Sequence, residues 1–170
     1  MHKLVLTGLI MLSSLANAGG WEDLDSWNEL EGWNEIPDPT ENIGKAWQDG
    51  SDNNLNLTQT GDGNLYRSMQ QGQENEIAAS QSGYQNAITV WQAGVGNTAI
   101  LNQTGDYNSV YLGQAGYGNT ATINQVGSYN SANVTQYGEN NSATITQIGV
   151  GLSVDITQSG NQSVEITQFN

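Results

Sequence analysis

Across most of the chain, small or apolar residues alternate with polar residues in short segments. In the segment 141–147, Ala143 and Ile145 fall on the same face as Gln147, and the residues between them are Thr. A period of two, with β-branched residues, is typical of a β-strand that buries one face. The pattern recurs to the C-terminus, with inward apolar pairs such as Val164 and Ile166. The sequence therefore predicts a succession of short strands.

The predicted strands recur at a fixed spacing of eleven, and three columns of identical residues mark the repeat. Gln occupies one inward position in every unit, with only the final step shorter by one: Gln59, Gln70, Gln81, Gln92, Gln103, Gln114, Gln125, Gln136, Gln147, Gln158 and Gln168. Gly lies two residues after each of the first ten: Gly61, Gly72, Gly83, Gly94, Gly105, Gly116, Gly127, Gly138, Gly149 and Gly160. Asn lies six residues before the Gln in nine units: Asn53, Asn64, Asn75, Asn86, Asn97, Asn108, Asn119, Asn130 and Asn141. Leu152 and Gln162 take the place of Asn in the last two units.

Each unit is expected to form a strand of seven residues and a turn of four, in which the Gly adopts a positive φ. One such strand cannot bury its inward face alone, so two consecutive units are expected to form a coil of 22 residues. Coils would then stack with parallel strands about 4.8 Å apart, and the inward Gln and Asn would form amide ladders. The predicted fold is all-β: a β-solenoid of strand–turn–strand coils with two stacked parallel sheets, of the cross-β amyloid type.

The ends of this predicted solenoid carry none of the usual protection against edge-to-edge association. No Pro follows Pro39, and Glu165 is the only charged residue in the last strand. Open strand edges are normally blocked by charges, Pro, bulges or covering elements. The missing protection indicates that end-to-end addition of further chains is the function.

Residues 1–18 have the pattern of a secretory signal peptide. Lys3 gives a basic start, a mostly apolar run follows from Leu4 to Leu15, and Ala18 ends a small-residue motif. Cleavage is expected between Ala18 and Gly19. The apolar run is too short to cross about 30 Å of membrane hydrocarbon, so we expect an exported chain.

Residues 19–50 are expected to form an acidic, Trp-rich and disordered leader, before a repeat domain at 51–170 that contains eleven units. Nine of the 17 acidic residues lie in this leader, and a six-residue motif begins at Trp21, Trp27 and Trp33. A period of six fits neither a helix nor a heptad. Two interpretations remain open: a solvated acidic leader, or a recognition segment that export machinery binds through its Trp residues.

Composition excludes several functional classes. The net charge of −14 argues against nucleic acid as a partner. The chain has no Cys, and its only His is His2, inside the predicted signal peptide. No pair of acidic residues recurs within the repeat, so a two-carboxylate hydrolase has no support. We expect no enzyme activity and no catalytic, cofactor-binding or metal site.

The repeat resembles the curlin repeat of curli fibre subunits, with the pattern Gln-x-Gly-x-x-Asn-x-[small or apolar]-x-[aliphatic]-x-Gln over residues 53 to 170. Residues 103–108 and 133–138 are especially similar to it. The resemblance implies a secreted functional amyloid that polymerises on the bacterial cell surface for adhesion and biofilm matrix. It implies as partners further copies of the chain, a related nucleator or major subunit, an outer-membrane export pore and periplasmic chaperones.

The resemblance does not decide which subunit this is. The leader departs from the family, because the leader associated with the major subunit is Gly-rich and this one is acidic and Trp-rich. The major subunit is the favoured interpretation. The alternatives are the minor, nucleating subunit of the same fibre and a monomeric β-solenoid adhesin.

Overall fold

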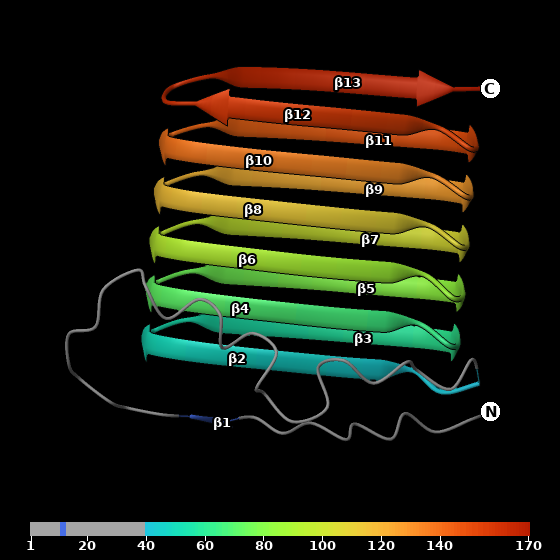
Figure 1. The fold of residues 1–170 in the computed structure, drawn as a ribbon, viewed down its shortest axis with the longest axis horizontal. Coiled ribbons are helices and arrows are strands. Elements are labelled where there is room, and N and C mark those ends of the chain that lie inside the picture. The colour runs from blue at the N-terminus through green and yellow to red at the C-terminus, as the bar shows by residue number, and fades with distance from the viewer. Residues whose placement is uncertain (1–10, 13–39) are drawn as a thin grey trace.

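The computed structural model describes residues 11–12 and 40–170, which form two parallel β-sheets that face each other (Figure 1). Sheet A contains β1 (Met11–Leu12), β2 (Ile43–Ser51), β4 (Leu65–Gln73), β6 (Ala87–Val95), β8 (Ser109–Tyr117), β10 (Ser131–Glu139) and β12 (Ser153–Ser159), in that spatial order. Sheet B contains β3 (Asn54–Asp62), β5 (Glu76–Tyr84), β7 (Thr98–Asp106), β9 (Thr120–Ser128), β11 (Ser142–Val150) and β13 (Ser163–Phe169). Apart from β1, the predicted signal peptide and the leader as far as residue 39 lie outside the described residues.

The chain passes from one sheet to the other at every turn, so each pair of strands completes one coil. Gln70 of β4 is in register with Gln92 of β6, and every neighbouring pair from β2 to β12 keeps this same offset of two repeat units. The predicted β-solenoid with two stacked parallel sheets is therefore confirmed. The residues described contain no helix long and apolar enough to cross a membrane.

The strands are longer and the turns shorter than the sequence pattern predicts. From β2 to β11 each strand has nine residues rather than seven, and two residues connect it to the next. The first connecting residue has a positive φ, even where it is not Gly. The non-Gly residues at this position are Asp52, Glu74, Gln85, Tyr107, Tyr129 and Asn140, with Asn161 in the last turn.

The solenoid also begins earlier than expected. β2 pairs in parallel with β4, which places Gln48 beside Gln70 and Gly50 beside Gly72. Residues 42–50 therefore belong to the repeat array, and the predicted boundary between leader and repeats at residues 50 and 51 lies one unit too late. The array has twelve strands, β2 to β13, rather than eleven.

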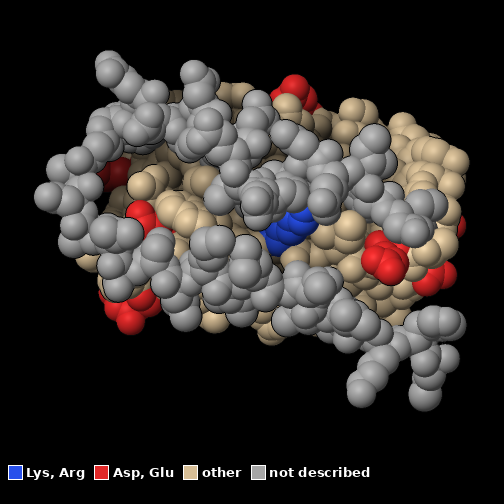
Figure 2. Space-filling model, turned by 60° about the horizontal axis from the view of Figure 1, so that its bottom comes forward, with Lys and Arg blue, Asp and Glu red and all other residues tan. Residues whose placement is uncertain are grey.

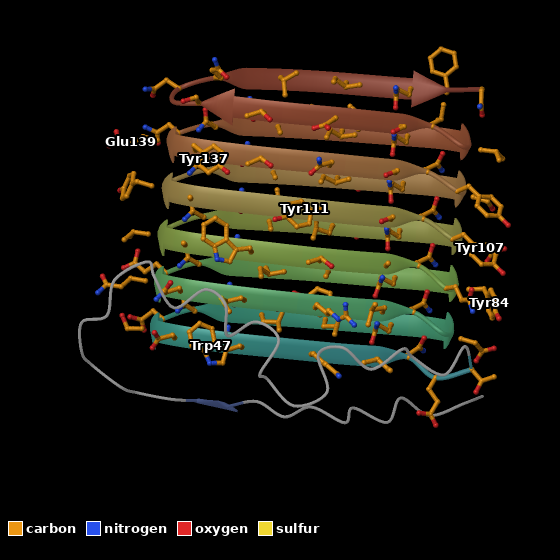
Figure 3. The ribbon with its side chains drawn as sticks, in the orientation of Figure 1. Trp47, Tyr84, Tyr107, Tyr111, Tyr137 and Glu139 are labelled. Carbon is orange, nitrogen blue, oxygen red and sulfur yellow. The ribbon has the colours of Figure 1, made fainter. Side chains whose placement is uncertain are left out.

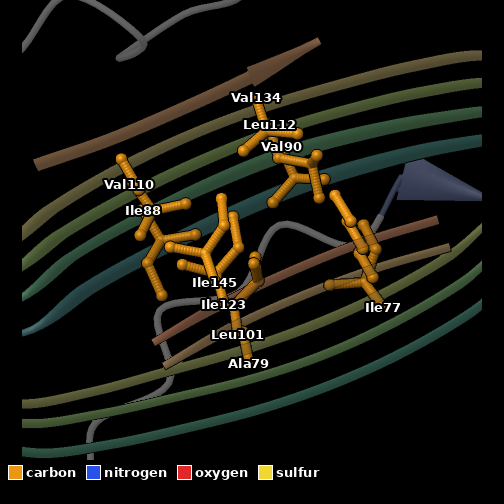
Figure 4. Close-up of a cluster of buried hydrophobic side chains, with 14 of the residues drawn as sticks. Ile77, Ala79, Ile88, Val90, Leu101, Val110, Leu112, Ile123, Val134 and Ile145 are labelled. Atoms are coloured by element: carbon orange, nitrogen blue, oxygen red, sulfur yellow. The ribbon is translucent and has the colours of Figure 1, made fainter. Parts of the chain in front are cut away.

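Inward side chains of the two sheets form one continuous core (Figure 4). Two small or aliphatic residues per strand supply most of it, in agreement with the predicted alternation. The buried set comprises Tyr66, Ile77, Ala79, Ile88, Val90, Ala99, Leu101, Val110, Leu112, Ala121, Ile123, Ala132, Val134, Ala143, Ile145 and Ile156.

The core is least regular at β4, where Tyr66 and Ser68 take the two inward positions. Both are buried, and neither hydroxyl has a hydrogen-bond partner of good geometry. Burial raises the pKa of the Tyr66 hydroxyl, and the nearby Ser68 side chain offsets part of that rise. In β2, Gly44 is the register neighbour of Tyr66, and a side chain at Gly44 would collide with Leu57. Tyr66, a large residue, and Gly44, the smallest, thus occupy the same inward column of sheet A.

Candidate functional site: amide ladders and open strand edges

The Gln side chains form one continuous amide ladder in each sheet. Sheet A carries Gln48, Gln70, Gln92, Gln114, Gln136 and Gln158, and sheet B carries Gln59, Gln81, Gln103, Gln125, Gln147 and Gln168. Ten hydrogen bonds of 2.5–3.0 Å connect neighbouring coils. In each of them, Nε2 of the Gln nearer the N-terminus donates to Oε1 of the next Gln.

Each Gln from Gln59 onward also connects the two sheets. Gln70 Nε2 donates to the main-chain oxygen of Asn54, the first residue of the facing strand β3, at 3.1 Å. The same bond recurs along the solenoid, for example from Gln147 to Ser131 at 3.1 Å. Buried amides cost free energy unless they are hydrogen-bonded. These contacts satisfy the amide groups at one edge of the core, which explains how polar residues occupy an inward column.

The Asn side chains form a second pair of ladders beside the turns. Asn64 donates both its main-chain N–H and its Nδ2 to Asn42 Oδ1, each at 2.9 Å. Seven Nδ2-to-Oδ1 bonds of 2.8–3.0 Å follow this pattern. In addition, Asn64 Nδ2 contacts the main-chain oxygen of Gly83 at 3.0 Å, which fixes the turn to the strand above it.

The Gln and Asn ladders run in opposite directions along the solenoid. Gln side chains donate toward the C-terminal coil, whereas Asn groups donate toward the N-terminal coil. At the N-terminal end, Oε1 of Gln48 and of Gln59 accepts no hydrogen bond from a described residue. At the C-terminal end, Gln158 and Gln168 have no further Gln to which they could donate. The two end faces are therefore chemically different and complementary.

The ten predicted turn Gly residues all have positive φ, but most lie in the last part of a strand rather than in the turn. For seven of them, from Gly61 to Gly127, an added Cβ would collide with the carbonyl oxygen of the Gly one coil on. Gly160 differs, since nothing lies within 4 Å of an added Cβ there. Close approach of backbones, as well as φ, thus requires Gly in most of the column.

All three columns have a first member that was not predicted from the sequence. Asn42 accepts hydrogen bonds from Asn64, Gln48 donates to Gln70, and Gly50 has a positive φ. The signal was present, because Asn42 precedes Gln48 by six residues and Gly50 follows it by two. Acidic and Trp-rich composition obscured this unit.

Two strands at the C-terminal end and one at the other end are open. In the part of the chain described, β12 and β13 end their sheets, and β3 ends sheet B at the opposite side. At this side of sheet A, the strand beyond β2 is β1, which lies inside the predicted signal peptide. Residues 11–12 and 40–170 contain no group of three or more acidic or His residues that could hold a metal ion.

The chain is a regular parallel β-solenoid with internal amide ladders and open strand edges. This architecture places it in the class of cross-β repeat proteins. A family model described as Curlin associated repeat matches residues 72–105, 96–127, 105–138 and 127–160. Together these matches cover just over half of the 170 residues, and the chain belongs to the curlin repeat family. No curated protein and no solved structure matches the chain.

Proposed function

We propose that the chain is the major structural subunit of a curli-type extracellular fibre, and that it grows by stacking further copies on its end coils. The observation that carries this proposal is the complementarity of the two ends. At one end Gln158 and Gln168 have no further Gln to which they can donate, and at the other end Oε1 of Gln48 and of Gln59 accepts no hydrogen bond from a described residue. A head-to-tail contact between two different faces leaves a further face open, so it produces a filament rather than a closed dimer.

The joint between chains follows from the register of the coils. β2 of one chain would continue sheet A beyond β12 of the previous chain, and β3 would continue sheet B beyond β13. Small inward residues of β2, Gly44 and Ala46, would then stack on Val154 and Ile156 of β12. Head-to-head contact would instead place acceptor against acceptor in both Gln columns. Directional ladders therefore favour a polar fibre.

The remaining parts of the proposal concern location and partners. The predicted signal peptide would direct the chain out of the cytoplasm, and the outer-membrane pore and chaperones of a curli system would deliver it unfolded to the cell surface. There the fibre would serve adhesion and the biofilm matrix. Because its two ends match each other, one chain type suffices for elongation, which supports the major subunit over the nucleating one.

Assembly kinetics of the purified mature chain, residues 19–170, test the proposal. With an amyloid dye, we expect a lag that preformed fibres abolish. Fibre diffraction should show cross-β reflections at about 4.8 Å and about 10 Å. A variant with Gln158→Ala and Gln168→Ala should elongate more slowly than a matched variant with Thr157→Ala and Thr167→Ala. A folded monomer that stays soluble for days would overturn the proposal and favour the monomeric adhesin.

A further inference from the structure

The outer face of sheet A carries an unusual group of side chains at its N-terminal end. Lys45 and Trp47 of β2 are register neighbours of Arg67 and Met69 of β4, and Trp91 of β6 extends the group. These five residues alternate with inward residues and are half-buried. We call them the cation–aromatic patch. Figure 3 shows Trp47 on the outer side of β2.

The patch contains every Lys and Arg of the predicted mature chain. Lys3 lies in the predicted signal peptide, which leaves Lys45 and Arg67 against 17 acidic residues. Figure 2 shows the blue atoms as one cluster near the middle of the face in view, with the red atoms toward its rim. Lys45 and Arg67 are register neighbours, and two like charges in this arrangement repel each other. An anionic partner would reduce this repulsion.

Arg67 supplies a second observation that points to such a partner. Its Nε is buried and makes no hydrogen bond to any described residue. A buried guanidinium nitrogen without an acceptor is costly. Carboxylates are the side-chain groups that satisfy Arg best, often through two parallel hydrogen bonds. The Nε of Arg67 thus lacks an acceptor among the described residues, and a carboxylate would supply one.

The chain itself contains a segment with the required chemistry. Residues 19–39 hold seven acidic residues and the three Trp residues of the six-residue motif. The segment ends at residue 39, four residues before β2 begins, so it is attached beside the patch. At about 3.3 Å per residue, it can extend roughly 70 Å, more than twice the roughly 30 Å length of a nine-residue strand.

We propose that residues 19–39 fold back onto the cation–aromatic patch of the same chain. Their carboxylates pair with Lys45 and Arg67, and Trp side chains pack on Trp47, Met69 and Trp91. This docking covers apolar surface on the outer face of β2, β4 and β6, and leaves the open edges of β12 and β13 free. It gives the leader a structural role in the folded subunit, separate from the proposed fibre function.

Zero-length cross-linking of the full mature chain tests the docking. A carbodiimide adds to a carboxylate and forms an activated ester. Lys45 Nζ attacks this ester to form an amide bond, and the carbodiimide leaves as a urea that has taken up the water lost from the carboxyl and amino groups. Only Lys45 and the α-amine of Gly19 can react, so the products identify the contact. We expect peptide mass spectrometry to join Lys45 to acidic residues between Glu22 and Asp38.

Two controls make the experiment decisive. In a mixture of isotope-labelled and unlabelled chains, we expect cross-linked peptides with a single isotope composition. Arg67→Gln should lower the cross-link yield several-fold, whereas Thr89→Gln, one register position further along the same face, should leave it unchanged. Absence of leader cross-links, mixed isotope pairs, or equal yields from both variants would overturn the docking. Fibre formation is scored separately by dye binding, so its failure would not be confused with this result.

Discussion

Asn130 Oδ1 accepts the main-chain N–H of Leu152 at 3.0 Å, and with Leu152 the Asn ladder of sheet A ends. Leu152 has no side-chain amide with which to continue the ladder. In sheet B, Asn141 Oδ1 likewise accepts the main-chain N–H of Gln162, at 3.2 Å, but Gln162 Oε1 turns back to the N–H of Ser159. The last coil therefore offers Gln groups, but no Asn acceptors, to a following chain.

Replacement of Leu152 by Asn should extend the ladder and strengthen the joint between chains. A restored amide contact contributes about 0.5–1.5 kcal/mol, so Leu152→Asn fibres should resist guanidinium better than Leu152→Ala fibres. The Ala variant is the reference because it removes the same half-buried apolar side chain. If the two variants dissolve at the same denaturant concentration, the Asn ladder contributes nothing at the joint.

Gln147→Ala should slow polymerisation strongly. Gln147 is fully buried, accepts from Gln125 at 2.8 Å and donates to Gln168 at 2.8 Å. Its loss leaves both neighbours with an unpaired amide group, at about 1–3 kcal/mol each. Thr146→Ala, one residue earlier on the outward face, should have little effect on the half-time of dye binding. Equal half-times would contradict the facing of this strand.

Ser68→Val should stabilise the chain and speed assembly. The Ser68 hydroxyl is buried without a partner, and its neighbours in the column are Ala46 and Val90. Removing an unsatisfied hydroxyl and adding apolar volume should contribute about 1–3 kcal/mol. Ser80→Val, at an outward position of β5, controls for the higher β-propensity of Val. Slower assembly of Ser68→Val than of Ser80→Val would count against the buried position.

Gly94→Ala should impair folding far more than Gly160→Ala. An added Cβ at Gly94 would meet the carbonyl oxygen of Gly116, and the strand would have to move. At Gly160 no atom is close, so only the positive φ is penalised, at roughly 1–2 kcal/mol. Fibre yield and denaturant resistance measure the difference. Comparable losses in both variants would show that φ alone, and not backbone contact, selects Gly.

Growth should start more readily from the C-terminal end. A peptide of residues 153–170 carries β12 and β13, whose edges are both open. We expect it to shorten the lag of the full chain, whereas a peptide of residues 53–70 should not. Dye-binding lag times at equal peptide concentration make the comparison. Seeding by both peptides, or only by the second, would place the active edge elsewhere.

The regular part of the fold could be predicted because every inward position recurs. The alternation around Ile145 was enough to predict the strand and its inward face. The spacing of the three columns was enough to predict the coil of 22 residues. Ser68 was recognisable for the same reason, as a hydroxyl in a column of aliphatic residues. Its burial in the structure follows directly from the period of two.

Features that depend on three-dimensional contacts could not be predicted in this way. The opposite directions of the ladders arise from how each amide meets both the facing strand and the next coil, as Gln70 does with Asn54 and Gln92. The first unit was missed because Trp47 and Asp49 made β2 resemble the acidic, Trp-rich leader. Turn length was overestimated, since Gly72 bends within the strand and pairs there with Gly94.

The hydrogen bonds between coils lie along the stacking axis, because each strand runs across it. A pulling force along a fibre of this kind would load all the bonds of one coil-to-coil plane together, whereas a sideways force would open them one after another. Inside a chain the connecting turns share the tension through covalent bonds, but no covalent bond crosses from one chain to the next. An overstretched fibre would therefore break beyond β13, and the broken ends would keep the faces needed to rejoin.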